Sequence, residues 1–236
     1  MTPGPELHKA QISILRSLRH APAARYTALR QPTGLESDVF KFHLRKLQQQ
    51  KLVQKCDTGE YHLTPAGKEF ANNLSQTANS IQKQPKLSVA IVVSRVIDGH
   101  REFLFQQRLR NPYYGFWGRI GGPVQWGESF EAAAERELAK QTSLRASFVV
   151  RSFYRKTDYD KQSRGLLEDK LFVVVEATNV RGELTNTWAG GHNAWMTIET
   201  LKAQPKYFDS PLDIIAMLNN DSAYAAKQAF YDTSDY

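Results

Sequence analysis

The stretch that decides the fold is NPYYGFWGRIGGPVQWGESFEAAAERELAKQTSL, residues 111–144. Its two adjacent glycines are followed by a loop and then by a helix predicted over residues 129–141, with Ser129 as N-cap. Five residues separate Gly122 from Glu128, and seven separate Glu128 from Arg136. The segment therefore combines a glycine turn, a loop carboxylate and a helix start at fixed spacing.

This spacing resembles the box of Nudix hydrolases, G-x5-E-x7-R-E-U-x-E-E-x-G-U, in which U is a bulky aliphatic residue. Five box residues fit: Gly122, Glu128, Arg136, Glu137 and Leu138. The resemblance covers about residues 85–220. It implies a Nudix α/β/α sandwich with a mixed sheet, in which Arg136 and Glu128 form a structural pair that ties the loop to the helix.

The sequence departs from the box where the family holds its metal. Positions 137, 140 and 141 are i, i+3 and i+4, so their side chains share one helix face. In the family, carboxylates there hold Mg²⁺ or Mn²⁺, which bridges a diphosphate and activates water. This chain has Glu137, Lys140 and Gln141, and the usual box glycine is Ser143. Glu137 is the one remaining metal candidate, and the scaffold is expected to bind rather than cut.

Two alternatives stay open for the chemistry. If the chain is an active hydrolase with Mg²⁺ or Mn²⁺, Glu137 and Glu128 are the catalytic candidates; otherwise no cofactor is expected. Glu131, Glu135 or Glu168 would then have to supply the missing carboxylates, although Glu131 and Glu135 are more simply a solvated helix face.

The ligand expected in the cleft is a nucleotide-derived phosphate compound similar to ADP-ribose. Arg108 and Arg119 are candidate phosphate ligands, and Lys140 can attract phosphate as a point charge beside Gln141. Among the aromatic residues near the box, Trp117 is assigned to the core. The rings that remain as candidates to stack on a ligand base are those of Tyr113 and Tyr114.

The excess positive charge of the chain lies in its first third. The net charge is +7, and residues 1–86 contain 13 Lys and Arg against 6 Asp and Glu, whereas residues 87–236 contain 18 of each kind. Apolar spacing predicts helices over residues 6–20, 26–30 and 36–49, a hairpin of strands over 52–56 and 60–63, and a helix that opens at Pro65. A basic small domain beside a neutral one suggests that the first contacts a polyanion.

This first segment resembles the winged helix-turn-helix of ArsR- and MarR-type regulators. The features that carry the resemblance are Gly34, the polar start of the third helix, His43-Leu44, Leu47 and Leu52-Val53. We expect Val39, Phe40, Leu44 and Leu47 to face inward, with His43 beside them. The residues expected to contact double-stranded DNA are Ser37, Lys41, Phe42, Arg45, Lys46 and Lys55. Lys41 and Arg45 can reach either guanine edges or phosphates. A solvated basic face or a protein-docking module remains the alternative.

The chain therefore divides into two domains of mixed α/β and α+β class. We predict a winged helix-turn-helix domain over residues 1–75, a linker rich in Asn, Ser and Gln over 76–86, a Nudix-like domain over 87–220 and a C-terminal tail over 221–236. In the second domain, strands are predicted over 87–96, 102–108, 147–154, 170–177 and 195–198, and a helix over 211–219.

Composition excludes several classes of protein. The single cysteine, Cys56, cannot form an internal disulfide, and no apolar run is long enough for a membrane helix. The start lacks the pattern of a secretory signal, so a cytoplasmic protein is expected.

These features together suggest a DNA-binding transcriptional regulator, a homodimer on two half-sites. We expect its degenerate Nudix domain to sense the nucleotide ligand. The alternatives are an active hydrolase of nucleoside diphosphate derivatives with a rearranged metal site, and an interaction module with neither ligand nor DNA.

Overall fold

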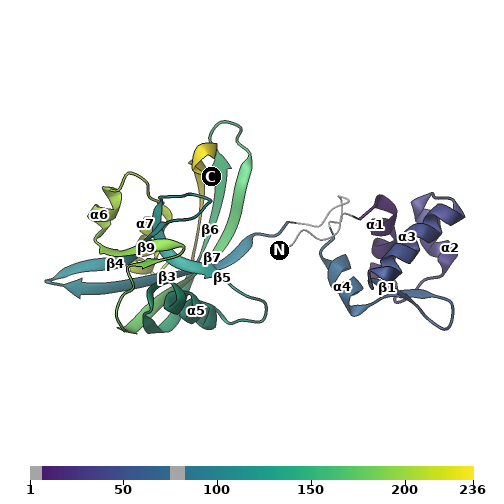
Figure 1. Cartoon of the computed structure of the whole chain (residues 1–236), viewed down its shortest axis with the longest axis horizontal. Helices are drawn as coiled ribbons and strands as arrows, with labels where there is room; N and C mark the ends of the chain where they lie inside the picture. Colours follow the sequence, from purple (N-terminus) through teal and green to yellow (C-terminus); the bar gives the residue numbers. More distant parts are fainter. Residues whose placement is uncertain (1–6, 75–82) are drawn as a thin grey trace. The chain divides into compact units, whose positions relative to one another are not determined.

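The protein is described as a computed structural model that covers residues 7–74 and 83–236. The chain divides into two compact units, Met1–Lys83 and Gln84–Tyr236 (Figure 1), and each is described by itself. Residues 76–82 of the linker predicted over 76–86 lie outside the described residues. The first residue of the helix predicted over 6–20 also lies outside them.

The N-terminal unit follows the element order that the sequence predicts. Its helices are α1 (Lys9–Arg19), α2 (Tyr26–Arg30), η1 (Gln31–Thr33), α3 (Ser37–Gln49) and α4 (Pro65–Asn72), and its antiparallel strands are β1 (Val53–Lys55) and β2 (Tyr61–Leu63). The Thr64 side chain accepts a hydrogen bond from Gly67 N and caps α4, which begins with Pro65 as expected.

Helix α3 buries one stripe of side chains in the core of this unit. Phe40, His43, Leu44 and Leu47 are buried at i, i+3, i+4 and i+7. The prediction that Val39 faces inward is wrong, because Val39 is 48% exposed. It precedes the stripe by one position. His43 is buried as expected, with its ring stacked 4.2 Å from that of His8.

The C-terminal unit is built on one mixed sheet of eight strands. The strands are β3 (Lys86–Ile97), β4 (His100–Arg108), β5 (Trp117–Pro123), β6 (Arg145–Asp160), β7 (Leu166–Arg181), β8 (Thr187–Trp188), β9 (Gly191–Met196) and β10 (Tyr224–Tyr231). Their order is β10-β6-β7-β3-β5-β4-β9-β8. The pairs β3–β7 and β10–β6 are parallel, and the other pairs are antiparallel.

Helices cover both faces of this sheet (Figure 1), which gives the layered α/β arrangement that was expected. Helix α5 (Phe130–Thr142) packs on the cluster that includes Val89 and Ile91 of β3. Helices α6 (Ile198–Lys202) and α7 (Ser210–Asn219) pack on the cluster that includes Ala90 and Val92. Successive side chains of β3 thus point to opposite faces of the sheet, and each face has its own hydrophobic core. A short η2 (Thr233–Asp235) ends the chain.

The prediction of a C-terminal tail over 221–236 is wrong, because this segment contains the strand β10. It pairs in parallel with β6, from Tyr224 opposite Phe153 to Tyr231 opposite Asp160. Its eight residues lie at the edge of the sheet, and alternate between half-buried and exposed without a fully buried face. This shallow burial explains why apolar patterning did not reveal the strand.

Strands β6 and β7 are also longer than predicted, and their outer ends form the long hairpin seen in Figure 1. Polar cross-strand pairs such as Arg155 and Asp169 extend the ladder beyond its apolar centre. No helix among the described residues combines the length and the apolar character required for a membrane span.

Candidate functional site

Gly121 and Gly122 bring β5 close to two neighbours. A Cβ on Gly121 would lie 2.2 Å from the carbonyl oxygen of Val89 in β3. A Cβ on Gly122 would lie 2.4 Å from Cδ of Glu137, which comes from α5. The backbone contact at Gly121 therefore requires glycine, and Gly122 lets a carboxylate of the helix lie directly against the strand.

The carboxylate of Glu137 is buried and is held by donors of the chain itself. Gln141, one helical turn later, donates its Nε2 to Glu137 Oε2 at 2.6 Å and to the Gly121 carbonyl oxygen at 2.9 Å. Arg136 forms an ion pair with the other oxygen of Glu137. The two hydrogens of the Gln141 amide are thus both used, at the point where two oxygens of the site converge.

Arg136 and Glu128 form the structural pair that the resemblance implied. Arg136 Nε and Nη2 donate to the two oxygens of Glu128, each at 2.8 Å, and Nη2 also donates to the Pro123 carbonyl at 2.9 Å. Gln125 N donates to Glu128 at 2.9 Å. The hydrogen bonds from Arg136 and then from this backbone N–H lower the pKa of Glu128 to about 2. The bidentate contact fixes the loop to α5.

Lys140 is exposed on α5 and lies beside an aromatic ring. Its Nζ is 5.6 Å from the ring centroid of Trp188, and the guanidinium of Arg110 is 5.4 Å from the same ring. In the part of the chain that the structure describes, no salt bridge joins either cation to a carboxylate. Two cations and a ring thus border the altered box.

Neutral amides continue the network from the box into the sheet. Asn193 of β9 donates to the Gln141 carbonyl at 2.7 Å and to the Thr185 carbonyl at 2.8 Å, and it accepts from Gln106 Nε2 at 2.9 Å. The sequence analysis singled out neither Gln106 nor Asn193. An amide within each of two apolar strands was the available signal.

The other carboxylates considered as metal ligands do not gather at the box. Glu131 and Glu135 are exposed on α5, and Glu168 forms ion pairs with Lys86 and Lys170. Residues 7–74 and 83–236 contain no group of three or more His, Cys, Asp or Glu side chains that could hold a metal ion. The residues at the box therefore do not fit the family's divalent metal.

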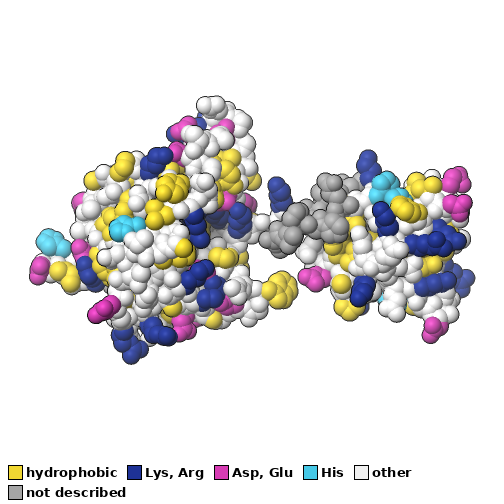
Figure 2. Space-filling view, viewed as in Figure 1, with side chains coloured by type: hydrophobic (Ala, Val, Ile, Leu, Met, Phe, Trp, Pro, Cys, Tyr) yellow, Lys and Arg dark blue, Asp and Glu magenta, His cyan; other side chains and the backbone are white. Residues whose placement is uncertain are grey.

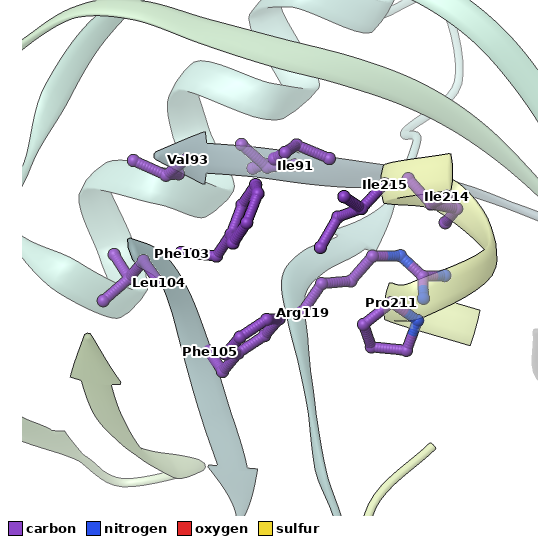
Figure 3. Close-up of a pocket in the computed structure, with 10 residues that line it drawn as sticks. Ile91, Val93, Phe103, Leu104, Phe105, Arg119, Pro211, Ile214 and Ile215 are labelled. Atoms are coloured by element: carbon purple, nitrogen blue, oxygen red, sulfur yellow. The ribbon is translucent and has the colours of Figure 1, made fainter. Parts of the chain in front are cut away.

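The structure separates Arg119 from Glu137, Lys140 and Gln141. Its side chain runs toward α7 (Figure 3), on the face opposite α5, and donates to Ser210 Oγ at 2.9 Å. Its guanidinium lies 4.1 Å from the ring centroid of Phe172, and burial lowers its pKa to about 10. The hollow in Figure 3 is otherwise lined by apolar side chains.

Arg108 is half-buried, and its Nε donates to the Pro112 carbonyl at 2.9 Å, while burial lowers its pKa.

Tyr113 belongs to the core rather than to a ligand surface. It is 1% exposed, and its hydroxyl donates to Asp158 Oδ2 at 3.0 Å. Its ring is in edge contact with Phe208 at 5.2 Å and with Tyr231 at 4.8 Å. The expected stacking of Tyr113 on a ligand is thus corrected, because neighbouring rings enclose it. Tyr114, in contrast, is 58% exposed.

A buried amine lies beside this aromatic cluster and was not anticipated. Lys156 Nζ is 2.7 Å from Asp158 Oδ1 and donates to the Tyr231 hydroxyl at 2.7 Å. The rings of Phe208 and Tyr231 lie 4.8 and 4.6 Å from the amine. Burial lowers the pKa of Lys156 to about 8 against the opposing effect of Asp158.

In the N-terminal unit, the residues expected to contact DNA are exposed. Ser37, Lys41, Phe42, Arg45 and Lys46 lie on the solvent side of α3, with Phe42 53% exposed. Lys46 Nζ is 4.8 Å from the Phe42 ring centroid, and Lys55 is exposed on β1. Figure 2 shows Lys and Arg side chains gathered on this unit.

Comparison with known proteins identifies the second unit. The NUDIX domain family model matches residues 86–216. The ADP-ribose pyrophosphatase of Methanocaldococcus jannaschii is 28% identical over 90 residues, which cover 38% of this chain and 53% of that protein. The chain thus spans about half the length of this curated relative.

A solved structure shows the same fold. The mutator MutT protein from Bacillus halodurans aligns with a TM-score of 0.50 and 18% identity, over 64% of this chain and 93% of that chain. The NUDIX domain of Shewanella oneidensis NrtR, solved with ADP ribose, aligns with a TM-score of 0.49 and 22% identity, over 67% and 98%. Because the family model covers more than half of the chain, including the glycine strand and the helix of the altered box, the protein belongs to the NUDIX domain family.

Proposed function

We propose that this protein is a DNA-binding transcriptional regulator whose NUDIX unit binds a nucleotide-derived diphosphate of the ADP-ribose type without metal-dependent cleavage. The observation that carries the proposal is the Gln141 amide, which lies between Glu137 Oε2 and the Gly121 carbonyl oxygen. A hard cation would need these two oxygens. The neighbouring cation Lys140 replaces a further carboxylate, so it repels a divalent ion instead of binding it.

The proposed ligand class rests on charge and on a relative. Lys140 and Arg110 lie beside the ring of Trp188. The two cations can bind an anionic phosphate next to the box, and the ring can contact a planar base. The relative from Methanocaldococcus jannaschii is named as an ADP-ribose pyrophosphatase. A diphosphate that joins two ribosyl groups is therefore the first ligand to test.

The DNA-binding half of the proposal rests on the N-terminal unit. Three helices, a two-stranded hairpin and a further helix follow one another in the order of a winged helix-turn-helix domain. The exposed side of α3 carries Lys41, Phe42 and Arg45 in a unit with excess positive charge. Such domains read two half-sites as dimers, which is the basis for proposing a homodimer.

Regulation requires that the ligand bind one DNA-affinity state better than another. The test has three measurements on the full-length protein: calorimetric binding of ADP-ribose in EDTA, DNA affinity with and without ADP-ribose, and release of mononucleotide with Mg²⁺ or Mn²⁺. We expect binding in EDTA, a ligand-dependent change in DNA affinity and no turnover. A lack of DNA binding at low salt would contradict the regulator, and a strict metal requirement would contradict the metal-free pocket.

The second candidate is an active hydrolase of nucleoside diphosphate derivatives. It is favoured by the name of the relative and by the retained Glu128, Arg136 and Glu137. The discriminating variant is Lys140→Glu combined with Gln141→Glu. If the native chain does not turn over and the double variant does, the native cleft is a binding site. Metal-dependent turnover of the native chain at ordinary enzyme rates would establish the hydrolase instead.

A further inference from the structure

The N-terminal unit has a hollow along α3 with a volume of ≈ 240 Å³. It lies between α2, α3 and β2, and its lining residues are Tyr26, Ser37, Lys41, Leu44, Arg45, Gln48 and Tyr61. Two of these side chains are cationic, four more carry a hydroxyl or an amide, and none is a carboxylate. The hollow therefore has the chemistry of an anion site.

The polar lining from α3 forms one stripe of that helix. Ser37, Lys41, Arg45 and Gln48 follow at intervals of four, four and three residues, so they lie above one another along the hollow. Phe42 lies one step further around the helix, and Lys46 covers its ring at 4.8 Å. The cations at 41 and 45 thus border the hollow, whereas the exposed aromatic ring lies outside it.

Tyr26 holds the upper end of this wall in place. Its hydroxyl donates to the Ser37 carbonyl at 2.8 Å and lies 3.1 Å from Ser37 Oγ. Its ring is in edge contact with buried Phe40 at 4.9 Å. The tyrosine thus ties α2 to the first turn of α3 beside the hollow, and Tyr26 is a positioning residue.

We propose that this hollow holds a backbone phosphate of double-stranded DNA, with Lys41 and Arg45 as its ligands, and that base reading falls to Phe42. The inference rests on the DNA-binding function proposed above. The lining has a guanidinium and an ammonium but no carboxylate, so its charge complements a phosphodiester. The volume of the hollow leaves room for the adjoining sugar. A phosphate contact positions the helix and carries no sequence information, whereas an exposed ring can contact a thymine methyl.

The experiment separates these two roles by salt dependence. Binding of full-length protein to a mixed-sequence duplex of about three helical turns is followed by fluorescence anisotropy between about 50 and about 200 mM salt. Lys41→Gln and Arg45→Gln are each expected to lower the slope of log Kd against log salt by about 0.9. Lys68→Gln, which removes an exposed cation from α4, is the matched control and should leave the slope unchanged. Lys41→Arg should retain the wild-type slope.

Selection from a random duplex pool then tests the reading residue. Phe42→Ala is expected to change the recovered sequence preference, and Lys41→Gln is expected to preserve it. The inference is overturned if Lys41→Gln and Arg45→Gln keep the wild-type slope, or if they alter sequence preference as much as Phe42→Ala. A wild-type protein that does not bind the duplex at low salt refutes the DNA-binding function itself, which is a distinct result.

Discussion

Replacement of Gln141 by Glu tests whether the amide occupies the place of a cation. The substitution removes a hydrogen bond of 2.6 Å to the Glu137 carboxylate and one of 2.9 Å to the Gly121 carbonyl. The first contact is worth about 1.5–3 kcal/mol because its acceptor is charged, and the second about 0.5–1.5 kcal/mol. The new carboxylate also faces Glu137 within a buried site, which forces proton uptake or repulsion.

We therefore expect Gln141→Glu to lower the free energy of unfolding by about 3–5 kcal/mol at neutral pH in EDTA. In the double variant with Lys140→Glu, Mg²⁺ or Mn²⁺ at about 100 times its Kd should restore about 2.7 kcal/mol. The wild type should gain nothing comparable, because its Gln141 amide already donates hydrogen bonds to the two oxygens that a cation would bind. Gln107→Glu is the matched control, since the Gln107 side chain donates only to the Gly115 carbonyl at 3.2 Å.

Urea denaturation followed by tryptophan fluorescence measures these changes in the NUDIX unit alone. The four tryptophans of the chain all lie in this unit: Trp117, Trp126, Trp188 and Trp195. The reasoning is refuted if Gln141→Glu is as stable as the wild type in EDTA. It is equally refuted if divalent metal stabilises the wild type as much as the double variant.

Three further changes have defined outcomes in the same denaturation assay. Ser143→Gly should raise the free energy of unfolding by about 0.5–1 kcal/mol, because Ser143 ends α5 with φ at 62° and glycine adopts this conformation without strain; a loss would contradict this. Gly122→Ala should lower it by about 1–3 kcal/mol, because the new Cβ would lie 2.4 Å from Cδ of Glu137, and an unchanged stability would show that the carboxylate moves freely. The third change uses pH, because burial lowers the pKa of Lys156 from 10.5 to about 8 in the folded unit. Between these two values the unfolded chain binds more protons than the folded one, so the free energy of unfolding rises with pH. From about pH 7 to about pH 10 the wild type should therefore gain up to about 3 kcal/mol of unfolding free energy relative to Lys156→Met. A constant difference would refute the lowered pKa.

The local part of the site could be predicted from the sequence. The box spacing indicated the helix, its Ser129 cap and the pairing of Arg136 with Glu128, and the helical period put positions 137 and 141 on one face. Each of these relations spans a few residues and depends on one regular element. The cap and the shared face of positions 137 and 141 follow from helix geometry. The pairing of Arg136 with Glu128 was implied by the resemblance to the Nudix box.

The contacts that join distant strands could not be predicted in this way. Asn193 and Gln106 lie 87 positions apart and meet because β4 and β9 are neighbours in the sheet. The face of the sheet on which Arg119 lies depends on a more local pattern. The next residue, Ile120, is buried toward α5, and alternation along the strand puts Arg119 on the opposite face. Tyr113 is buried by rings from segments late in the chain, which no local pattern reveals.

The edge strand β10 has a consequence for the order in which the unit is completed during synthesis. It leaves the ribosome after the other strands of this sheet, yet it supplies Tyr231, whose hydroxyl and ring cover the amine of Lys156. Until β10 pairs with β6, that strand has an unpaired edge and the amine of Lys156 lacks the cover of Tyr231. A chain that stops near residue 220 therefore exposes both the strand edge and the amine to solvent. Truncated genes and shortened expression clones of this protein should therefore give aggregation-prone products, even though every residue of the NUDIX match would be present.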